Sequence, residues 1–259
     1  MQLFDAHCHL DDEHFDVDRE EIIDKIFEAG VTRLISAGYS LAGSKASIEL
    51  SKKYDFIYST VGISPNDLSE NYLEEIAEIE KLLEENKDNK KLVAVGEIGL
   101  DYHYDTDKDI QKEAFIKQIE LANKYNLPIV IHTRDAVMDT LSILKEHPVA
   151  KKGIFHCCPF NRELVKEALN LGYNISICGP VTFKNSKNAE EIVNMIPNDR
   201  FTIETDSPYL APEPVRGTRN DPRNVLHIAQ KIASFKGLTD EEIANLAYSN
   251  ACRIFDIKM

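Results

Sequence analysis

Short apolar runs alternate along this chain with longer stretches in which apolar residues recur at helical spacing. The short runs are rich in β-branched residues and are nearly continuous, which is typical of strands buried on both faces of a parallel sheet. The pattern predicts eight strands, at Leu3–His7, Val31–Ala37, Phe56–Ile63, Leu92–Ile98, Pro128–His132, Gly153–His156, Tyr173–Cys178 and Phe201–Thr205.

Amphipathic segments fill the intervals between these runs. The predicted helices are Asp18–Ala29, Leu41–Tyr54, Tyr72–Glu85, Ile110–Tyr125, Asp135–Glu146, Arg162–Leu171 and Ala189–Ile196, followed by helical regions at Pro222–Phe235 and Asp240–Phe255. Thr239 and Glu242 have the spacing of a capping box that opens the last of these.

Eight strand–helix units in about 250 residues are the expected content of a (β/α)₈ TIM barrel. No linker or low-complexity segment divides the chain, so we expect one α/β domain over residues 1–259. An open, doubly wound sheet is the alternative. It is disfavoured because no Gly-x-Gly-x-x-Gly follows the first strand.

Composition limits the compartment and the partners. The net charge of −14 argues against a broad basic surface for long duplex DNA. The arginines Arg216, Arg219 and Arg223 form either a local anion site or ordinary surface charge. Without a bilayer-length apolar run or a signal-peptide pattern, we expect a cytoplasmic protein with no membrane partner. Five cysteines, none in a Cys-x-x-Cys pattern, do not suggest a disulfide framework.

Side chains able to bind a metal stand at the ends of five predicted strands. His7 and His9, two residues apart on the first strand, point to the same side. On its own, this spacing is more often that of two partly buried, hydrogen-bonded histidines than of a metal site. In a barrel, however, the carboxyl ends of all strands meet at one face, and polar groups there are costly unless paired. The set predicts a metal centre built from His7, His9, Glu97, His132, His156 and Asp206.

Six ligands exceed the needs of one tetrahedral ion and suit two ions that share a bridge. Glu97 is the natural bridge because a carboxylate has two oxygens. We expect one ion between His7, His9, Asp206 and Glu97, and a second between Glu97, His132 and His156. An activated water would be the nucleophile and Asp206 its general base. The mixed ligands admit Mg, Mn, Zn, Ni or Fe, and the sequence leaves open the metal and the oligomeric state, a monomer included.

Three acidic residues lie close to the predicted ligands without being counted among them. Asp101 either contacts substrate or stabilises its own loop. Asp5 shares a face with His7 and either orients it or bonds to a loop. Glu204 lies one step deeper than Asp206 and is interpreted as structural.

The segments that carry these residues resemble the TatD family of metal-dependent hydrolases over essentially the whole chain. The matching stretches are FDAHCHLDD (4–12), VGEIGLDY (95–102), LPIVIHTRDA (127–136), GIFHC (153–157), ISICGPVTFKN (175–185), ETDSPYLAPEP (204–214), RGTRNDPRNV (216–225) and NACRIFDI (250–257). The resemblance implies a TIM barrel, divalent metals and phosphodiester hydrolysis, described as DNase activity. It places metal ligands on the same six residues.

This chain departs from the family pattern at Ser64, Asn66, Cys158 and Val215: Ser64, Asn66 and Val215 each stand where the family commonly has a histidine, and Cys158 begins a Cys-Pro-Phe that replaces the usual Phe-Ser-Gly. We expect all four around the cleft that holds substrate, where Arg216, Arg219 and Asp101 are the candidate substrate contacts. None of the departures removes a metal ligand.

The favoured function is a divalent-metal phosphodiesterase or deoxyribonuclease of the 3′-end exonuclease type. Its partner would be single-stranded or end-accessible DNA, or a small phosphoester. The alternative is an amidohydrolase that cleaves ester or C–N bonds of a small molecule or aminoacyl ester. Such barrels often bridge their metals with a modified lysine on the fourth strand, where this chain has Glu97. A non-catalytic scaffold is a third possibility, disfavoured by the intact ligand set.

Overall fold

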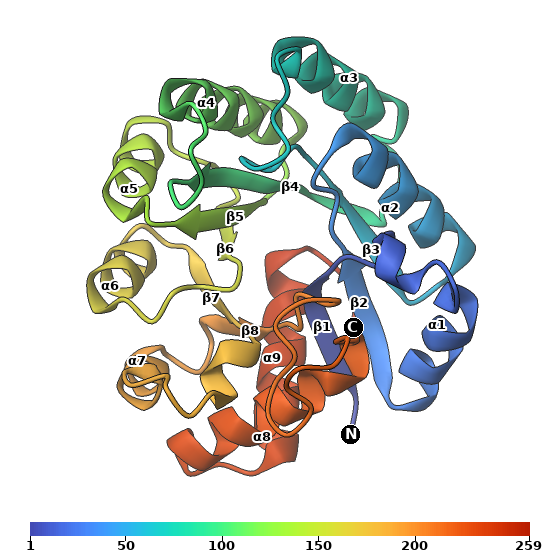
Figure 1. Ribbon diagram of the computed structural model, residues 1–259, viewed down its shortest axis with the longest axis vertical. Helices are drawn as coiled ribbons and strands as arrows, with labels where there is room; N and C mark the ends of the chain where they lie inside the picture. Colours follow the sequence, from blue (N-terminus) through green and yellow to red (C-terminus); the bar gives the residue numbers. More distant parts are fainter.

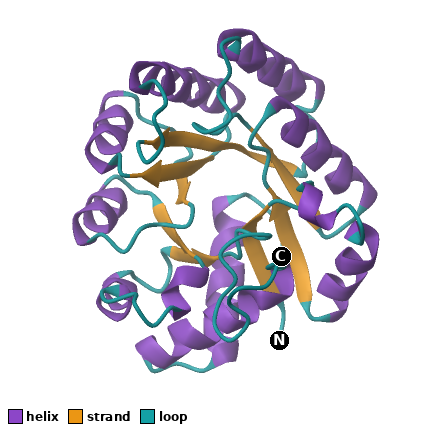
Figure 2. Cartoon of the chain, viewed as in Figure 1, coloured by secondary structure: helices purple, strands orange, loops and turns teal.

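Eight parallel strands form a single sheet in the order β1 to β8, with helices around its outside (Figures 1 and 2). The computed structural model describes residues 1–259. The strands are β1 (Leu3–Cys8), β2 (Val31–Ser36), β3 (Ile57–Val61), β4 (Leu92–Asp101), β5 (Ile129–Arg134), β6 (Gly153–Phe155), β7 (Asn174–Ile177) and β8 (Phe201–Ile203).

A helix follows every strand, and a ninth ends the chain. They are α1 (Arg19–Glu28), α2 (Leu41–Lys53), α3 (Tyr72–Glu85), α4 (Lys108–Tyr125), α5 (Val137–Glu146), α6 (Arg162–Asn170), α7 (Ala189–Met195), α8 (Val225–Lys236) and α9 (Asp240–Ile254). The region predicted as one helix from Pro222 divides into a 3₁₀ turn, η3 (Pro222–Asn224), and α8. None of the helices is long and apolar enough to cross a bilayer.

Hydrogen bonds just beyond β8 join it to β1 and nearly close the barrel. The Asp206 amide donates to the His7 carbonyl at 3.0 Å, and the His9 amide donates to the Ser207 carbonyl at 2.8 Å. Asp5, fully buried, accepts bonds from the amide and hydroxyl of Thr205 and from the His7 amide. Asp5 therefore holds the seam between the first and last strands and touches the backbone of His7 rather than its ring.

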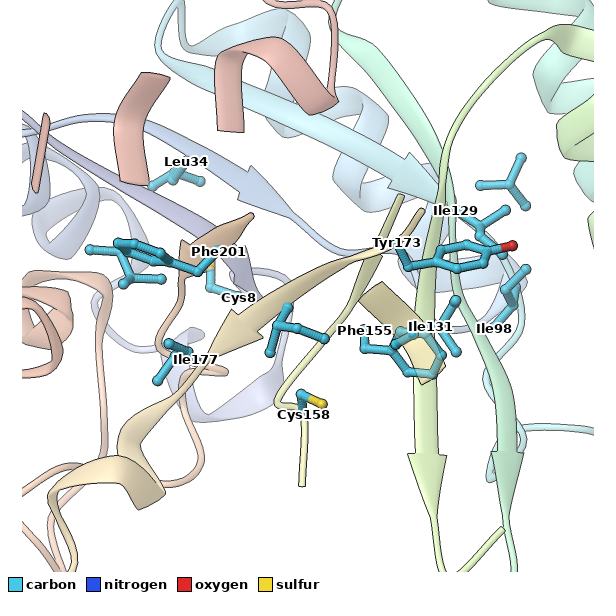
Figure 3. Close-up of a cluster of buried hydrophobic side chains, with 14 of the residues drawn as sticks. Cys8, Leu34, Ile98, Ile129, Ile131, Phe155, Cys158, Tyr173, Ile177 and Phe201 are labelled. Atoms are coloured by element: carbon cyan, nitrogen blue, oxygen red, sulfur yellow. The ribbon is translucent and has the colours of Figure 1, made fainter. Parts of the chain in front are cut away.

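Apolar side chains of the strands pack against the surrounding helices in one large cluster. Figure 3 shows part of it, where Phe155 and Ile131 lie on paired positions of neighbouring strands. The Tyr173 ring meets Phe155 edge-on at 5.6 Å between centroids. A second cluster joins Phe4 to the end of α9. The predicted capping box of Thr239 and Glu242 opens α9. The α/β TIM barrel predicted from the sequence is confirmed.

Candidate metal centre

Two histidines at the end of β1 converge at the carboxyl end of the barrel. His7 is the last residue but one of β1 and is fully buried, while His9 directly follows the strand. Their Nε2 atoms are 3.2 Å apart. The two-residue spacing therefore places both imidazoles on one side, as the alternation of a strand requires.

Glu97 lies between these histidines and a second pair. A register shift after Val95 separates the β4 positions that pair with β5, so the chain bulges at Gly96 and Glu97. A Cβ at Gly96 would stand 2.6 Å from that of Val130, which explains the glycine. The Glu97 Oε2 atom faces His7 Nε2 at 3.4 Å, whereas Oε1 faces the opposite direction.

The second pair of histidines comes from the ends of β5 and β6. His132 Nδ1 lies 2.9 Å from Glu97 Oε1, and His156 Nε2 lies 3.4 Å from the same oxygen. The two nitrogens are 3.3 Å apart. Each oxygen of one carboxylate thus serves a different histidine pair, which is the arrangement a bridging ligand needs.

The donor atoms fit a pair of divalent ions. Around Glu97 Oε2, the Nε2 atoms of His7 and His9 and Asp206 Oδ1 are separated by 3.2 to 3.6 Å in the five contacts that join them. Ligand atoms on a tetrahedron with bonds of about 2.1 Å are about 3.4 Å apart. The second set, made of Glu97 Oε1, His132 Nδ1 and His156 Nε2, has separations of 2.9 to 3.4 Å and leaves positions open for water and substrate. These residues would hold the two ions.

The charges of the centre favour a bound cation. Burial opposes ionisation of Glu97, but His156, His132 and His7 outweigh it and hold its pKa well below the usual range. Burial also opposes ionisation of Asp206, yet His9 and the other imidazoles lower its pKa. The carboxylates are therefore ionised. Burial opposes protonation of His9, His132 and His156, but neighbouring carboxylates raise the pKa of these three rings, so they hold protons that a metal ion would displace. Burial lowers the pKa of His7, which favours its neutral form.

Two further carboxylates fix the ring orientation of metal-facing histidines. Asp101 is 1% exposed, and its Oδ2 accepts a bond from His132 Nε2 at 3.0 Å and one from the Asn66 amide at 3.0 Å. Burial opposes ionisation, but these bonds and that from the His103 amide lower the pKa of Asp101 to about 2. A proton on Nε2 leaves His132 Nδ1 free to bind metal.

Glu204 does the same for His156. Its Oε1 accepts from His156 Nδ1 at 3.1 Å and from the Cys157 amide at 2.5 Å, and its Oε2 accepts from the Ser176 hydroxyl. The carboxylate is completely buried. The sequence interpretation of Glu204 as structural missed this role, although its alternation with Asp206 on one face was a usable signal.

A cavity of about 850 Å³ opens over the centre. Besides ligands, its lining includes Tyr39, Tyr104 and Tyr209, one arginine, Arg134, and the substituted residue Asn66. Tyr104 and Tyr209 are about half exposed, and the Arg134 guanidinium lies 5.7 Å from the Tyr104 ring centre. Beyond the metal-facing residues, the wall therefore combines flat aromatic surfaces with a single arginine.

A model of the family described as TatD related DNase matches residues 4–256. This chain belongs to the TatD family. A Bacillus subtilis relative, described as the uncharacterized metal-dependent hydrolase YabD, is 45% identical over 257 residues, covering 98% of this chain and 99% of the relative. The Escherichia coli metal-dependent hydrolase YcfH is 36% identical, covering 99% of this chain and 97% of its own. The crystal structure of YjjV, a TatD homologue from Escherichia coli, superposes with a TM-score of 0.92 at 25% identity, covering 99% of this chain and 98% of its own.

The departures from the TatD pattern lie in different surroundings. Ser64 and Asn66 line the cavity, as expected. Cys158 does not: its amide donates to the Ser176 carbonyl at 3.1 Å, continuing the pairing of β6 with β7, and its side chain belongs to the large core cluster. Val215 also lies outside the lining. The expectation that all four surround the cleft is corrected for these two.

The structure does not bring Arg216 or Arg219 into the cavity lining of this TatD-family protein. Arg219 makes two bonds of 2.7 Å to the carboxylate of Asp18 and stacks on Phe15. The Arg216 guanidinium stacks on Phe183, with its central carbon 4.0 Å from the ring centre. Proximity in the sequence had suggested an anion site, whereas partners distant in the sequence occupy both side chains.

Proposed function

We propose that this TatD-family protein is a two-metal phosphodiesterase that removes nucleotides from the ends of single-stranded DNA. The observation that carries the proposal is Glu97, whose two oxygens face two separate sets of donor atoms. Two ions about 3.5–4 Å apart are the usual means of stabilising both the attacking and the leaving oxygen in phosphodiester cleavage.

The ions, when bound, supply Lewis acidity and lower the pKa of water toward neutrality. The chain's own residues do the rest. Asp206 accepts the proton of the attacking water at a carboxylate oxygen, because the surrounding imidazoles keep its pKa low and the group ionised. Asp101 and Glu204 prevent His132 and His156 from turning. Glu97 keeps the two donor sets at a fixed separation.

The cavity wall supports a single-stranded substrate. The exposed rings of Tyr104 and Tyr209 offer surfaces on which bases can stack, and Arg134 offers a charge for a phosphate. With a net charge of −14, the protein has little to hold a long duplex. A strand end that reaches into the cavity needs only these local contacts.

The test is cleavage of single-stranded oligonucleotides labelled at the 3′ or the 5′ end, with Mg²⁺ or Mn²⁺ added to metal-stripped protein. We expect metal-dependent release of mononucleotides from the 3′ end, and loss of more than about 100-fold in kcat/KM for His132→Ala. His227→Ala on α8 is the matched control, because that histidine lies away from the cavity. Hydrolysis of carboxylic esters or amides, with no phosphodiester cleavage under any metal, would overturn the proposal.

A further inference from the structure

Two thiols lie side by side behind the metal centre. Cys157 follows the ligand His156 and lines the cavity, and Cys178 follows β7 and is 2% exposed. Their sulfur atoms and an oxygen of Glu204 all lie within 4.8 Å of one another. We propose that Cys157 and Cys178 are an oxidative modification site: they form a reversible disulfide that loosens the hold of His156 on its metal ion.

The backbone already brings the two cysteines together. β6 and β7 are neighbours, with Phe155 paired to Ile175, and the Cys158–Ser176 hydrogen bond continues this contact past the strand ends. A disulfide needs sulfurs about 2.05 Å apart on neighbouring backbone segments. The two sulfurs, which lie within 4.8 Å of one another, still have to approach, and a shift of the Cys157 backbone is part of that movement.

Little holds either sulfur in its present place. The Cys178 thiol donates one long bond, 3.4 Å, to the Thr205 carbonyl. Cys157 has a positive φ of 38°, a conformation that residues with a side chain rarely adopt. Rotation of these side chains toward each other therefore breaks one weak contact and starts from a strained backbone.

A metal ion between the two thiols fits the surroundings less well. Glu204 is already bonded through both oxygens to His156, Cys157 and Ser176. The two sulfurs would then be the only free donors, whereas a structural zinc ion takes four. A covalent bond between the sulfurs needs no further ligand.

The chemistry requires a peroxide as oxidant. The Cys157 sulfur, on the cavity wall, attacks the peroxide oxygen and becomes a sulfenic acid, with release of water from hydrogen peroxide. The Cys178 sulfur then displaces the sulfenic oxygen as a second water. Two thiols lose two electrons and two protons, and one peroxide is reduced to two waters. A cellular dithiol reverses the step by exchange.

The link to the metal centre runs through Glu204. Its Oε1 accepts bonds from both the Cys157 amide and His156 Nδ1. Drawing Cys157 toward Cys178 displaces that amide and the residue beside it, so the ring of His156 loses its fixed orientation. Loss of such an orienting contact typically weakens metal affinity 10- to 100-fold, and we expect a change in that range.

The experiment treats the full-length, metal-loaded protein with hydrogen peroxide, blocks the remaining thiols by alkylation and maps tryptic peptides by mass spectrometry. The expected product links the peptide 153–162 to the peptide 167–184. Cys158→Ser is the matched control, because it removes the thiol next to Cys157 and must leave the link intact. Cys178→Ser must abolish it, and dithiothreitol must reverse it in the wild-type protein.

The functional arm compares Mn²⁺ affinity of reduced and oxidised wild-type protein, which needs no variant and does not depend on the DNA substrate proposed above. We expect 10- to 100-fold weaker binding of one ion after oxidation, restored by dithiothreitol. A bond confined to the peptide 153–162, or oxidation of Cys157 to the sulfinic acid with no linked peptide, would overturn the pairing. A linked protein with unchanged Mn²⁺ affinity would overturn the coupling to His156.

Discussion

Asp101→Asn separates two roles for a residue that the sequence had placed among the substrate contacts. In the structure its Oδ2 accepts a hydrogen bond from His132 Nε2 at 3.0 Å. Burial opposes ionisation of Asp101, but the hydrogen bonds that its carboxylate accepts outweigh burial and lower its pKa to about 2. The substitution keeps the size of the side chain and removes the charge. An amide that turns its nitrogen toward His132 would also favour the wrong tautomer of the ring.

The expected effect is on metal binding first. Orienting carboxylates of this kind change metal affinity or activity by about 10- to 100-fold, which corresponds to about 1.4–2.7 kcal/mol. Because the contact serves one ring nitrogen of one ligand, we expect a single site to weaken. Glu97, His132 and His156 form that site, and the site built on His7 and His9 should keep its affinity.

The assay is a calorimetric titration of metal-stripped protein with Mn²⁺, followed by kcat and KM on a single-stranded oligonucleotide at saturating metal. Asp135→Asn is the control, since that exposed carboxylate lies near the cavity but contacts no metal-facing histidine. Unchanged affinity for both ions together with a raised KM would refute the reasoning and restore Asp101 to the role of a substrate contact.

Four further outcomes follow from the contacts described. Glu97→Gln should reduce the bound metal from two ions to one or none, measured by elemental analysis, and should lower kcat in the nuclease assay by more than about 100-fold. Retention of two ions would contradict the role of Glu97 as a bridge. Burial alone would lower the pKa of His9, but neighbouring carboxylates raise it to about 9, so the metal-free ring is protonated at neutral pH. Metal binding should therefore release a proton and strengthen as the pH rises toward 9, and calorimetric heats that do not depend on the buffer's ionisation enthalpy would refute this. Arg219→Ala should leave KM for the oligonucleotide unchanged and lower the free energy of unfolding in urea by roughly 1 kcal/mol or more, because it removes the part-buried, two-bond ion pair with Asp18 and the stacking on Phe15. A raised KM would return Arg219 to the substrate site. Gly99→Ala should destabilise the protein by about 3 kcal/mol or prevent folding, because a Cβ there would stand 2.0 Å from a carbonyl oxygen of β5, and a wild-type thermal midpoint would contradict it.

Strand periodicity and strand ends were enough to predict the barrel and to nominate its ligand set. His7 and His9 followed from the alternation of side chains in β1, and His132 and His156 from apolar runs that end in an imidazole. These signals are local in the sequence, so they can be recognised without knowledge of the tertiary structure. Several observed helix ends differ from the predicted ones by one to three residues, for example where the turn η3 precedes α8.

The partners of polar side chains could not be predicted in the same way. Asn66 was visible only as a departure from a family pattern, and its bond to Asp101 joins the ends of two different strands. Arg219 looked free in the sequence because Asp18, which it binds, lies at the opposite end of the chain. Such pairings depend on which loops the closed barrel brings together.

Because the metal centre spans the seam between β1 and β8, the ligands of its two positions become available at different stages of synthesis. His7 and His9 emerge from the ribosome first, but Asp206 emerges only after seven strands have been made. The three ligands of the other position, Glu97, His132 and His156, have all been made once β6 is followed by His156, although Glu204, which orients His156, comes only after β8. The position that includes Asp206 therefore lacks a ligand until the last strand has been made and has joined the first, so occupancy of that position would report closure of the barrel.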